Sequence, residues 1–293
     1  MGSSTRPFST VLVDRGQLEC VHGKIGFARR APDENAPTRI SPREYDYPMV
    51  DHEVTIRNAR PIVNELSLDR EGFALVKHKM SCLNERNPEI LRRKYLEEMV
   101  PFVKDYFKAS WVTPMDLGGF TIRSIGGKSF DRPAERQVTK YTVRGHGAGY
   151  AHIDYAPVAG PMIAAHDSQL QGIEIRSYSR LILIQTWRAI SPPPQDLPLA
   201  FCDGSSLSET DLLDMCFRGY GVTHRSWGLH YSPSQRWYYV PDLVPDELYL
   251  FKGYDSDMHY HRWSAHSAFD NRGAYPDAKP RESIETRFYV YYE

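Results

Sequence analysis

The sequence predicts a mainly β protein, a β-sandwich or barrel with flanking helices. Three observations predict it: segments rich in β-branched and aromatic residues dominate after Tyr150, the last of them alternates regularly, and helical periodicity lies mostly before Tyr150. With 41% hydrophobic and 25% charged residues, the 293-residue chain has the composition of an ordinary globular protein that can bury a core.

The predicted strands are separated by Pro, Gly, Asp and Ser, which favour turns. In the C-terminal segment one parity is mostly apolar, and the other carries Glu285 and Arg287. Side chains two apart on a strand share a face, so this segment predicts one apolar and one polar face. The strand segments are 181–187, 236–240, 247–251 and 284–292.

Two helices are predicted from caps and periodicity. The first follows Asn87-Pro88, a favourable cap and first-turn pair, with apolar residues at helical spacing up to Phe107. The second is expected from Ser208 to Cys216, because Ser208 can cap it and acidic residues occupy its first turn.

We expect a single domain over residues 1–293. An irregular N-terminal arm, about residues 1–60, is expected to pack on a core of about 61–293. Residues 23–47 are rich in Arg, Pro and Asp, which predicts a surface loop. Neither a repeat nor a long linker divides the chain.

Charge and cysteine usage limit the possible partners and compartment. The chain has 36 basic and 37 acidic side chains without long runs of one sign, which argues against nucleic acid as a partner. The four cysteines are widely spaced, and the start lacks the apolar core of a signal peptide. A reduced, cytoplasmic protein without a membrane span is therefore expected.

One triplet has the spacing of a metal site. His152-Ile-Asp154 is the single His-x-Asp/Glu match, and with 11 histidines and 37 acids one such match is expected by chance. On a strand, however, residues two apart point to the same face and can chelate one ion. Two histidines and one carboxylate would leave open positions on an iron(II) ion, so a third ligand is needed.

Several downstream histidines could supply that ligand. His266 is preferred because arginines follow it that could bind the carboxylate of a 2-oxo acid bidentately. Arg281, Ser283 and Arg287 share one parity and form the candidate anchor. The other candidate ligands are His166, His224, His230, His259 and His261.

Structural roles remain as alternatives for all these residues. His-x-Asp on a strand can be a hydrogen-bonded pair, and an arginine in a terminal strand can be solvated or salt-bridged. The Trp237–Tyr239 run can belong to the core or to the wall of an apolar pocket. We take as candidate pocket residues Trp187, Arg188, Trp237 and Tyr239.

Longer blocks of sequence resemble a known family. Residues 198–206, 235–256, 265–270 and 281–287 are similar to the fungal asaB-like hydroxylase/desaturase family, a group of CmcJ- and NvfI-type non-haem iron oxygenases. The resemblance covers about residues 141–292 and is weak in the N-terminal half. His152 and Asp154 match the family's His-x-Asp, and His266 matches its second histidine, although Ala265 replaces the usual proline.

The resemblance implies a double-stranded β-helix (jelly-roll) core, with iron(II), 2-oxoglutarate and dioxygen as cofactor and co-substrates. It implies a small-molecule secondary metabolite as substrate, changed by hydroxylation, desaturation, endoperoxidation or oxidative cyclisation, and a homodimer as the assembly. Arg281 and Arg287 both match the family's C-terminal strand, and the match does not choose between them as anchor. Two alternatives stay open: a non-haem iron oxidase that does not consume 2-oxoglutarate, and a silent ligand-binding jelly roll.

Overall fold

Two β-sheets make up most of the protein. The computed structural model describes residues 13–30, 39–40, 48–116, 118–124, 142–144, 148–175, 177–219 and 222–293. Within these residues one sheet has nine strands and the other seven, and the first runs in the order β1-β3-β13-β10-β15-β8-β12-β11, with β2 on β3. The second runs in the order β4-β14-β9-β16-β6-β7, with β5 on β16.

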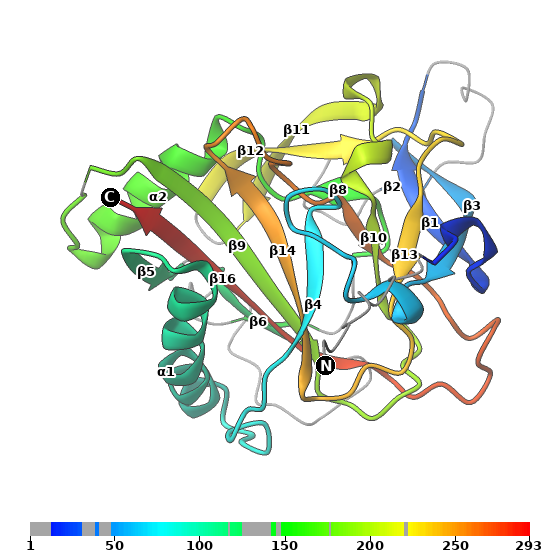
Figure 1. Cartoon of the computed structure of the whole chain (residues 1–293), viewed down its shortest axis with the longest axis horizontal. Helices are drawn as coiled ribbons and strands as arrows, with labels where there is room; N and C mark the ends of the chain where they lie inside the picture. Colours follow the sequence, from blue (N-terminus) through cyan, green and yellow to red (C-terminus); the bar gives the residue numbers. More distant parts are fainter. Residues whose placement is uncertain are drawn as a thin grey trace, which may run out of the picture.

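The strands of the nine-stranded sheet come from both halves of the chain (Figure 1). They are β1 (Cys20–Ala28), β2 (Arg39–Ile40), β3 (Pro48–Asn58), β8 (His152–Ile153), β10 (Leu199–Cys202), β11 (Leu212–Gly219), β12 (Val222–Leu229), β13 (Trp237–Tyr239) and β15 (His266–Ala268).

The seven-stranded sheet is built around three long neighbours, β14, β9 and β16, which lie side by side in Figure 1. Its strands are β4 (Phe73–Lys77), β5 (Trp111–Pro114), β6 (Phe120–Ser124), β7 (Thr142–Arg144), β9 (Arg180–Ala189), β14 (Glu247–Asp255) and β16 (Glu282–Tyr292).

Helix α1 (Pro88–Phe107) covers the outer face of the seven-stranded sheet. Asn87 caps it by accepting hydrogen bonds from the backbone N–H groups of Glu89 and Ile90, as the sequence predicted. Its buried stripe includes Leu91 and Met99, and it packs against alternate residues of β9, β14 and β16. Apolar residues on this face of the sheet therefore form a core with α1.

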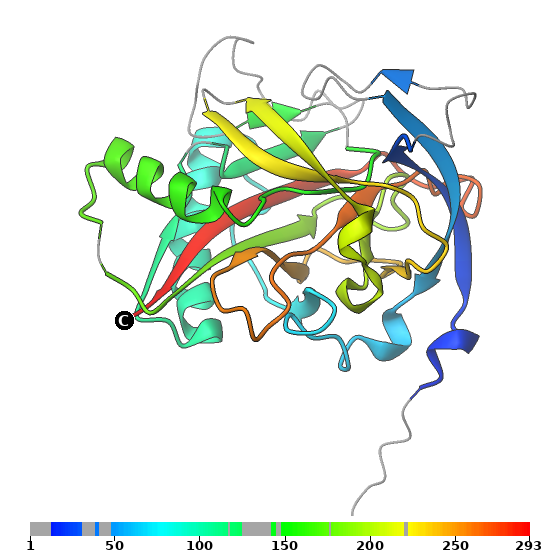
Figure 2. The same ribbon diagram turned by 90° about the horizontal axis from the view of Figure 1, so that it is seen from above.

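Helix α2 (Ala159–Gln171) lies near one end of the same sheet, on the side away from β1 and β3 (Figure 2). It packs with Leu181, Leu183 and Tyr254, and Gly160 allows it to approach closely because a Cβ there would overlap the Tyr254 ring. The sequence analysis did not predict α2, because small residues and a weak apolar stripe hide its periodicity.

The space between the sheets holds the core that positions the site. Phe73, Phe201, Tyr238, Tyr249 and Phe251 come from both sheets and pack together, with Phe73 and Phe201 stacked at 4.6 Å. On the far side of the nine-stranded sheet a second cluster includes residues of β1, β3, β8, β10, β12 and β13. The predicted mainly β architecture with flanking helices is thus present.

Three predictions about local structure were wrong. The segment from Ser208 does form a capping box with Asp211, but the turn is a single 3-10 turn (Glu209–Asp211), and β11 follows at once and pairs with β12. Residues 20–28 and 48–58 of the expected arm are paired strands, not loop. Strands are also abundant before Tyr150, and α2 lies after it. Residues 31–38 and 41–47 of the expected surface loop lie outside the described residues. The division of the chain into a single domain stays a prediction.

The four cysteines are all free thiols. Among the helices of the described residues, none has the length and apolar character needed to cross a bilayer.

Candidate metal centre

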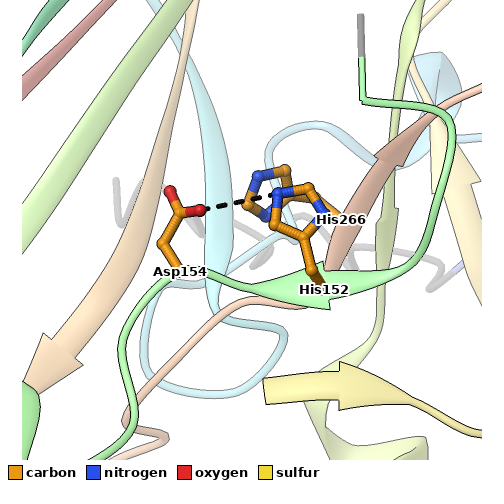
Figure 3. A group of neighbouring side chains, drawn as sticks. All are labelled: His152, Asp154 and His266. Atoms are coloured by element: carbon orange, nitrogen blue, oxygen red, sulfur yellow. Dashed lines mark ion pairs between the residues drawn. The ribbon is translucent and has the colours of Figure 1, made fainter. Parts of the chain in front are cut away.

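Strand pairing brings two distant histidines together. In the antiparallel pair β8–β15, His152 stands directly opposite His266. Residues opposite each other in such a pair project from the same face of the sheet, and the two ring centroids lie 4.3 Å apart (Figure 3). The face is the inner one, because His266 also contacts Phe201 and Phe251 of the core between the sheets.

Asp154 completes the group from the residue just after β8. One ligand atom from each of His152, Asp154 and His266 can be chosen so that all lie within 4.8 Å of one another. The Nε2 atom of His152 lies 3.5 Å from Oδ1 of Asp154, as Figure 3 shows. The other carboxylate oxygen, Oδ2, accepts a hydrogen bond from Nη2 of Arg287 at 2.9 Å. Arg287 therefore holds one oxygen and leaves the second facing the histidines.

Backbone carbonyls fix the tautomer of both histidines. Nδ1 of His152 lies 2.9 Å from the carbonyl oxygen of Tyr150, and Nδ1 of His266 lies 3.1 Å from that of Ser264. A carbonyl can only accept, so each Nδ1 carries the proton and each Nε2 keeps its lone pair. Such second contacts orient metal-binding histidines in many sites.

Burial and charge hold His152 and Asp154 in the ionisation states that a cation needs. Both histidines are almost completely buried, and burial lowers the pKa of His152 to about 4. Burial alone would raise the pKa of Asp154, but the Arg287 guanidinium and the two imidazoles lower it below its usual range. Two neutral imidazoles and one carboxylate form a donor set suited to a divalent transition metal with open positions.

The predicted anchor residues lie on the inner face of β16, where Glu285 also lies. Arg287 is fully engaged: Nε donates to Oε1 of Gln185 at 2.9 Å, Nη1 to the carbonyl of Gly118 at 2.8 Å, and Nη2 to Asp154. It also forms an ion pair with Glu285 at 2.5 Å. Its contacts are those of a residue that orients the carboxylate of Asp154.

Arg281 differs from Arg287 because no carboxylate contacts its guanidinium within the described residues, although its backbone N–H donates to Oδ1 of Asp196 at 2.9 Å. Its side chain is only 1% exposed, Nη1 donates to the carbonyl of Leu197 at 2.5 Å, and its guanidinium lies over the ring of Trp187 at 5.5 Å. Burial, together with nearby Arg123, lowers the pKa of Arg281. Nε of Arg281 and the hydroxyl of Ser283 have no hydrogen-bond partner in the described part of the chain. These buried donors suit the carboxylate of a small ligand.

The candidate pocket residues divide between the two sides of their strands. Trp187 lies in the core between the sheets, beside Arg281. Arg188 points the other way, donating to the hydroxyl of Tyr95 and to backbone carbonyls under α1, so its assignment to the pocket was wrong. Trp237 and Tyr239 were also assigned wrongly: they pack in the cluster on the far side of the nine-stranded sheet.

The sequence analysis missed two residues of the site. Gln185 holds Arg287, and its Nε2 atom is buried with no hydrogen-bond partner among the described residues. Arg123 pairs with the buried Glu285 at 3.7 Å. Alternation could have indicated Gln185, since it lies two residues before Trp187 on β9 and so shares its face. The sequence pattern gave no indication that Arg123 belongs to the site, because only the pairing of β6 with β16 places it beside the anchor residues.

The chain is similar to several known proteins. The chain is 26% identical to the hydroxylase/desaturase efuI of Hormonema carpetanum, over 99% of this chain and 95% of the relative. It is 26% identical to the Fe(II)/2-oxoglutarate-dependent dioxygenase nvfI of Aspergillus novofumigatus, over 86% and 89%. A solved structure of the iron and alpha-ketoglutarate-dependent endoperoxidase NvfI superposes with a TM-score of 0.70 at 24% identity, over 94% and 99%.

These matches confirm the predicted resemblance and the predicted jelly-roll fold. The model of the Oxidoreductase/YMDC permease-like domain family matches residues 26–291, which include both sheets and all three candidate ligands. This chain therefore belongs to the Oxidoreductase/YMDC permease-like domain family.

Proposed function

We propose that the protein is an Fe(II)/2-oxoglutarate-dependent oxygenase that acts on a small-molecule secondary metabolite. The observation that carries the proposal is the combination of two buried donor sets on one inner surface. The first is the oriented imidazole pair of His152 and His266 with the carboxylate of Asp154. The second is the buried guanidinium of Arg281, which contacts no described carboxylate, together with the hydroxyl of Ser283. Relatives named as Fe(II)/2-oxoglutarate enzymes support the same assignment.

In this proposal His152, Asp154 and His266 hold iron(II), which when bound supplies the oxidising chemistry with dioxygen. The protein contributes geometry: Arg287 keeps one oxygen of Asp154 occupied, so the carboxylate offers the other as a single ligand atom. Three protein ligands leave positions for a bidentate 2-oxo acid and for dioxygen. Both imidazoles are buried, and burial lowers the pKa of His152 to about 4, so that His152 is unprotonated at neutral pH.

We assign the far carboxylate of 2-oxoglutarate to Arg281 and Ser283, and not to Arg287. Arg287 already donates to two acceptors besides Asp154, so binding another carboxylate would require breaking the support of a metal ligand. Arg281 is a buried cation whose charge would be compensated by the incoming anion. A buried charge left without a counter-ion costs free energy, so this residue favours an oxygenase that uses 2-oxoglutarate over the alternative oxidase that does not.

The free cysteines support a reducing compartment, and we propose the cytoplasm as the location. The homodimer stays a prediction. Hydroxylation, desaturation, endoperoxidation and oxidative cyclisation all remain possible outcomes for the proposed oxygenase.

Anaerobic metal binding followed by turnover tests the function. The purified protein should bind one Fe(II), or Mn(II) as a redox-silent substitute, and release succinate from 2-oxoglutarate when oxygen is admitted. His152→Ala should lose both properties, whereas His259→Ala, which changes an exposed histidine outside the group, should keep both.

Succinate release by His152→Ala at the wild-type rate would remove this site from consideration. Iron binding and substrate oxidation without succinate would favour the alternative oxidase, and absence of stoichiometric metal binding would favour the silent jelly roll.

A further inference from the structure

A cavity opens on the inner side of the nine-stranded sheet, away from the candidate metal centre. Its volume is about 470 Å³. Strand register relates the two sites: Arg57 of β3 stands beside Tyr238 of β13, Tyr238 beside Phe201 of β10, and Phe201 beside His266 of β15. Neighbouring strands are about 4.8 Å apart, so Tyr238 and His266 are separated by roughly 10 Å across the sheet.

Phe201 separates the cavity from the metal centre. Its ring is completely buried, stacks on Phe73 and packs on Tyr249 at 4.7 Å. Four arginines and three acidic residues line the cavity, so the net formal charge of its lining is +1. The charged lining residues are Arg15, Arg57, Glu65, Arg70, Glu71, Asp203 and Arg236.

The two buried acids are already satisfied. Glu71 accepts from Arg15 at 2.8 Å, from Arg70 at 2.6 Å and from the backbone N–H of Ser67 at 2.8 Å. These contacts use both carboxylate oxygens of Glu71. A charged ligand in the cavity therefore does not meet an unpaired buried carboxylate at this position.

Asp203 is satisfied in the same way. It accepts from Nη2 of Arg236 at 2.8 Å and from the backbone N–H and hydroxyl of Ser205 at 2.9 and 2.7 Å. Arg236 keeps its charge, because its ion pair with Asp203 outweighs the effect of burial and raises its pKa.

Two donors in the cavity are left over. Arg57 is half-buried, and among the described residues no acid forms an ion pair with it. Tyr238 is completely buried, and its hydroxyl has no hydrogen-bond partner of good geometry in the described part of the chain. The hydroxyl lies near cationic Arg236, which cannot accept its proton. A buried hydrogen-bond donor without an acceptor costs free energy of folding, and a bound ligand that accepts the hydrogen bond would recover it.

We propose that this cavity is a second ligand site, which binds a small oxyanion, a carboxylate or a phosphate group, between Arg57 and the hydroxyl of Tyr238. The guanidinium supplies charge and two parallel N–H donors, and the phenol supplies one O–H donor from the adjacent strand. The remaining guanidinium groups add positive potential but stay committed to Glu71 and Asp203. The site needs no iron, so it is independent of the proposed oxygenase function.

Titration calorimetry on the metal-free full-length protein tests the site, with inorganic phosphate and benzoate as separate probes at constant ionic strength. Wild type should bind at least one probe saturably, one molecule per chain, and the preferred probe identifies the class of oxyanion. Arg57→Gln should weaken that binding about tenfold or more, since it removes a charge-assisted contact, and Tyr238→Phe should weaken it several-fold. Arg93→Gln, an exposed arginine of α1, is the matched control and should leave affinity unchanged.

Thermal melts of each variant establish that it is folded before titration. Absence of saturable binding by both probes would overturn the proposal. So would binding that Arg57→Gln leaves within twofold of wild type, because the anion would then occupy another site such as Arg281.

Discussion

Exchange of Arg281 for glutamine is the sharpest perturbation of the proposed co-substrate site. The guanidinium is buried, contacts no described carboxylate and has an unpartnered Nε. Glutamine keeps a hydrogen-bond donor but removes the charge and the bidentate geometry. A charge-assisted hydrogen bond contributes about 1.5–3 kcal/mol, and each 1.4 kcal/mol is a factor of about ten in affinity. We expect the Kd of 2-oxoglutarate to rise about 10- to 100-fold.

Arg287→Gln is the matched variant, because it makes the same exchange on the same face of β16. Arg287 supports Asp154 through the 2.9 Å hydrogen bond to Oδ2. Loss of such support for a metal ligand typically costs 10–100-fold in metal affinity. Metal binding should therefore weaken in Arg287→Gln and stay close to wild type in Arg281→Gln.

The assay is anaerobic calorimetry in two steps, Mn(II) into protein and then 2-oxoglutarate into the Mn(II)-saturated protein. Saturation with metal in the second step separates co-substrate affinity from metal affinity. If Arg281→Gln leaves the Kd of 2-oxoglutarate within twofold while Arg287→Gln raises it strongly at full metal occupancy, the assignment of the anchor is refuted.

Three further predictions concern stability and reactivity. Gly204→Ala should lower the free energy of unfolding by about 1–3 kcal/mol, measured by urea denaturation, because the added Cβ would overlap the ring of His261. If the same substitution costs as much stability in a His261→Ala background, the overlap with His261 is not the cause. Burial lowers the pKa of His261, so the unfolded chain takes up a proton more readily as the pH falls through 6.5. Stability should therefore decrease from pH 7.5 to 5.5, less steeply in His261→Gln; equal slopes would exclude His261 as the source. Burial raises the pKa of Cys202 to about 12, whereas Cys20 and Cys216 are exposed. Iodoacetamide at pH 8 should therefore label Cys20 and Cys216 in the folded protein and Cys202 only after denaturation, which peptide mass spectrometry can check.

Local chemistry was sufficient to predict several elements. Asn87 and Pro88 begin α1 because their capping contacts involve neighbours in sequence. The alternation of β16 predicted its two faces, since the period of a strand does not depend on its partners. Ser208 shows the limit of this reasoning: its capping box forms, yet pairing of β11 with β12 turns the following residues into a strand. Tertiary pairing overrode the local preference for helix.

The sequence by itself determined the donor types of the candidate site: the His152–Asp154 spacing, a preferred third histidine, and two arginines on one face of the last strand. Spacing could not show that β8 and β15 are neighbours, which alone places His152 opposite His266. Spacing also could not distinguish Arg281 from Arg287 as the anchor, because the two residues are an even number of positions apart and so point to the same side of an extended strand. The tertiary structure distinguishes their contacts, since Arg287 finds its acceptors on other strands and loops, while the guanidinium of Arg281 is buried and contacts no described carboxylate. Side-chain direction follows from the period of a single strand, but partners depend on which strands pair and in what register.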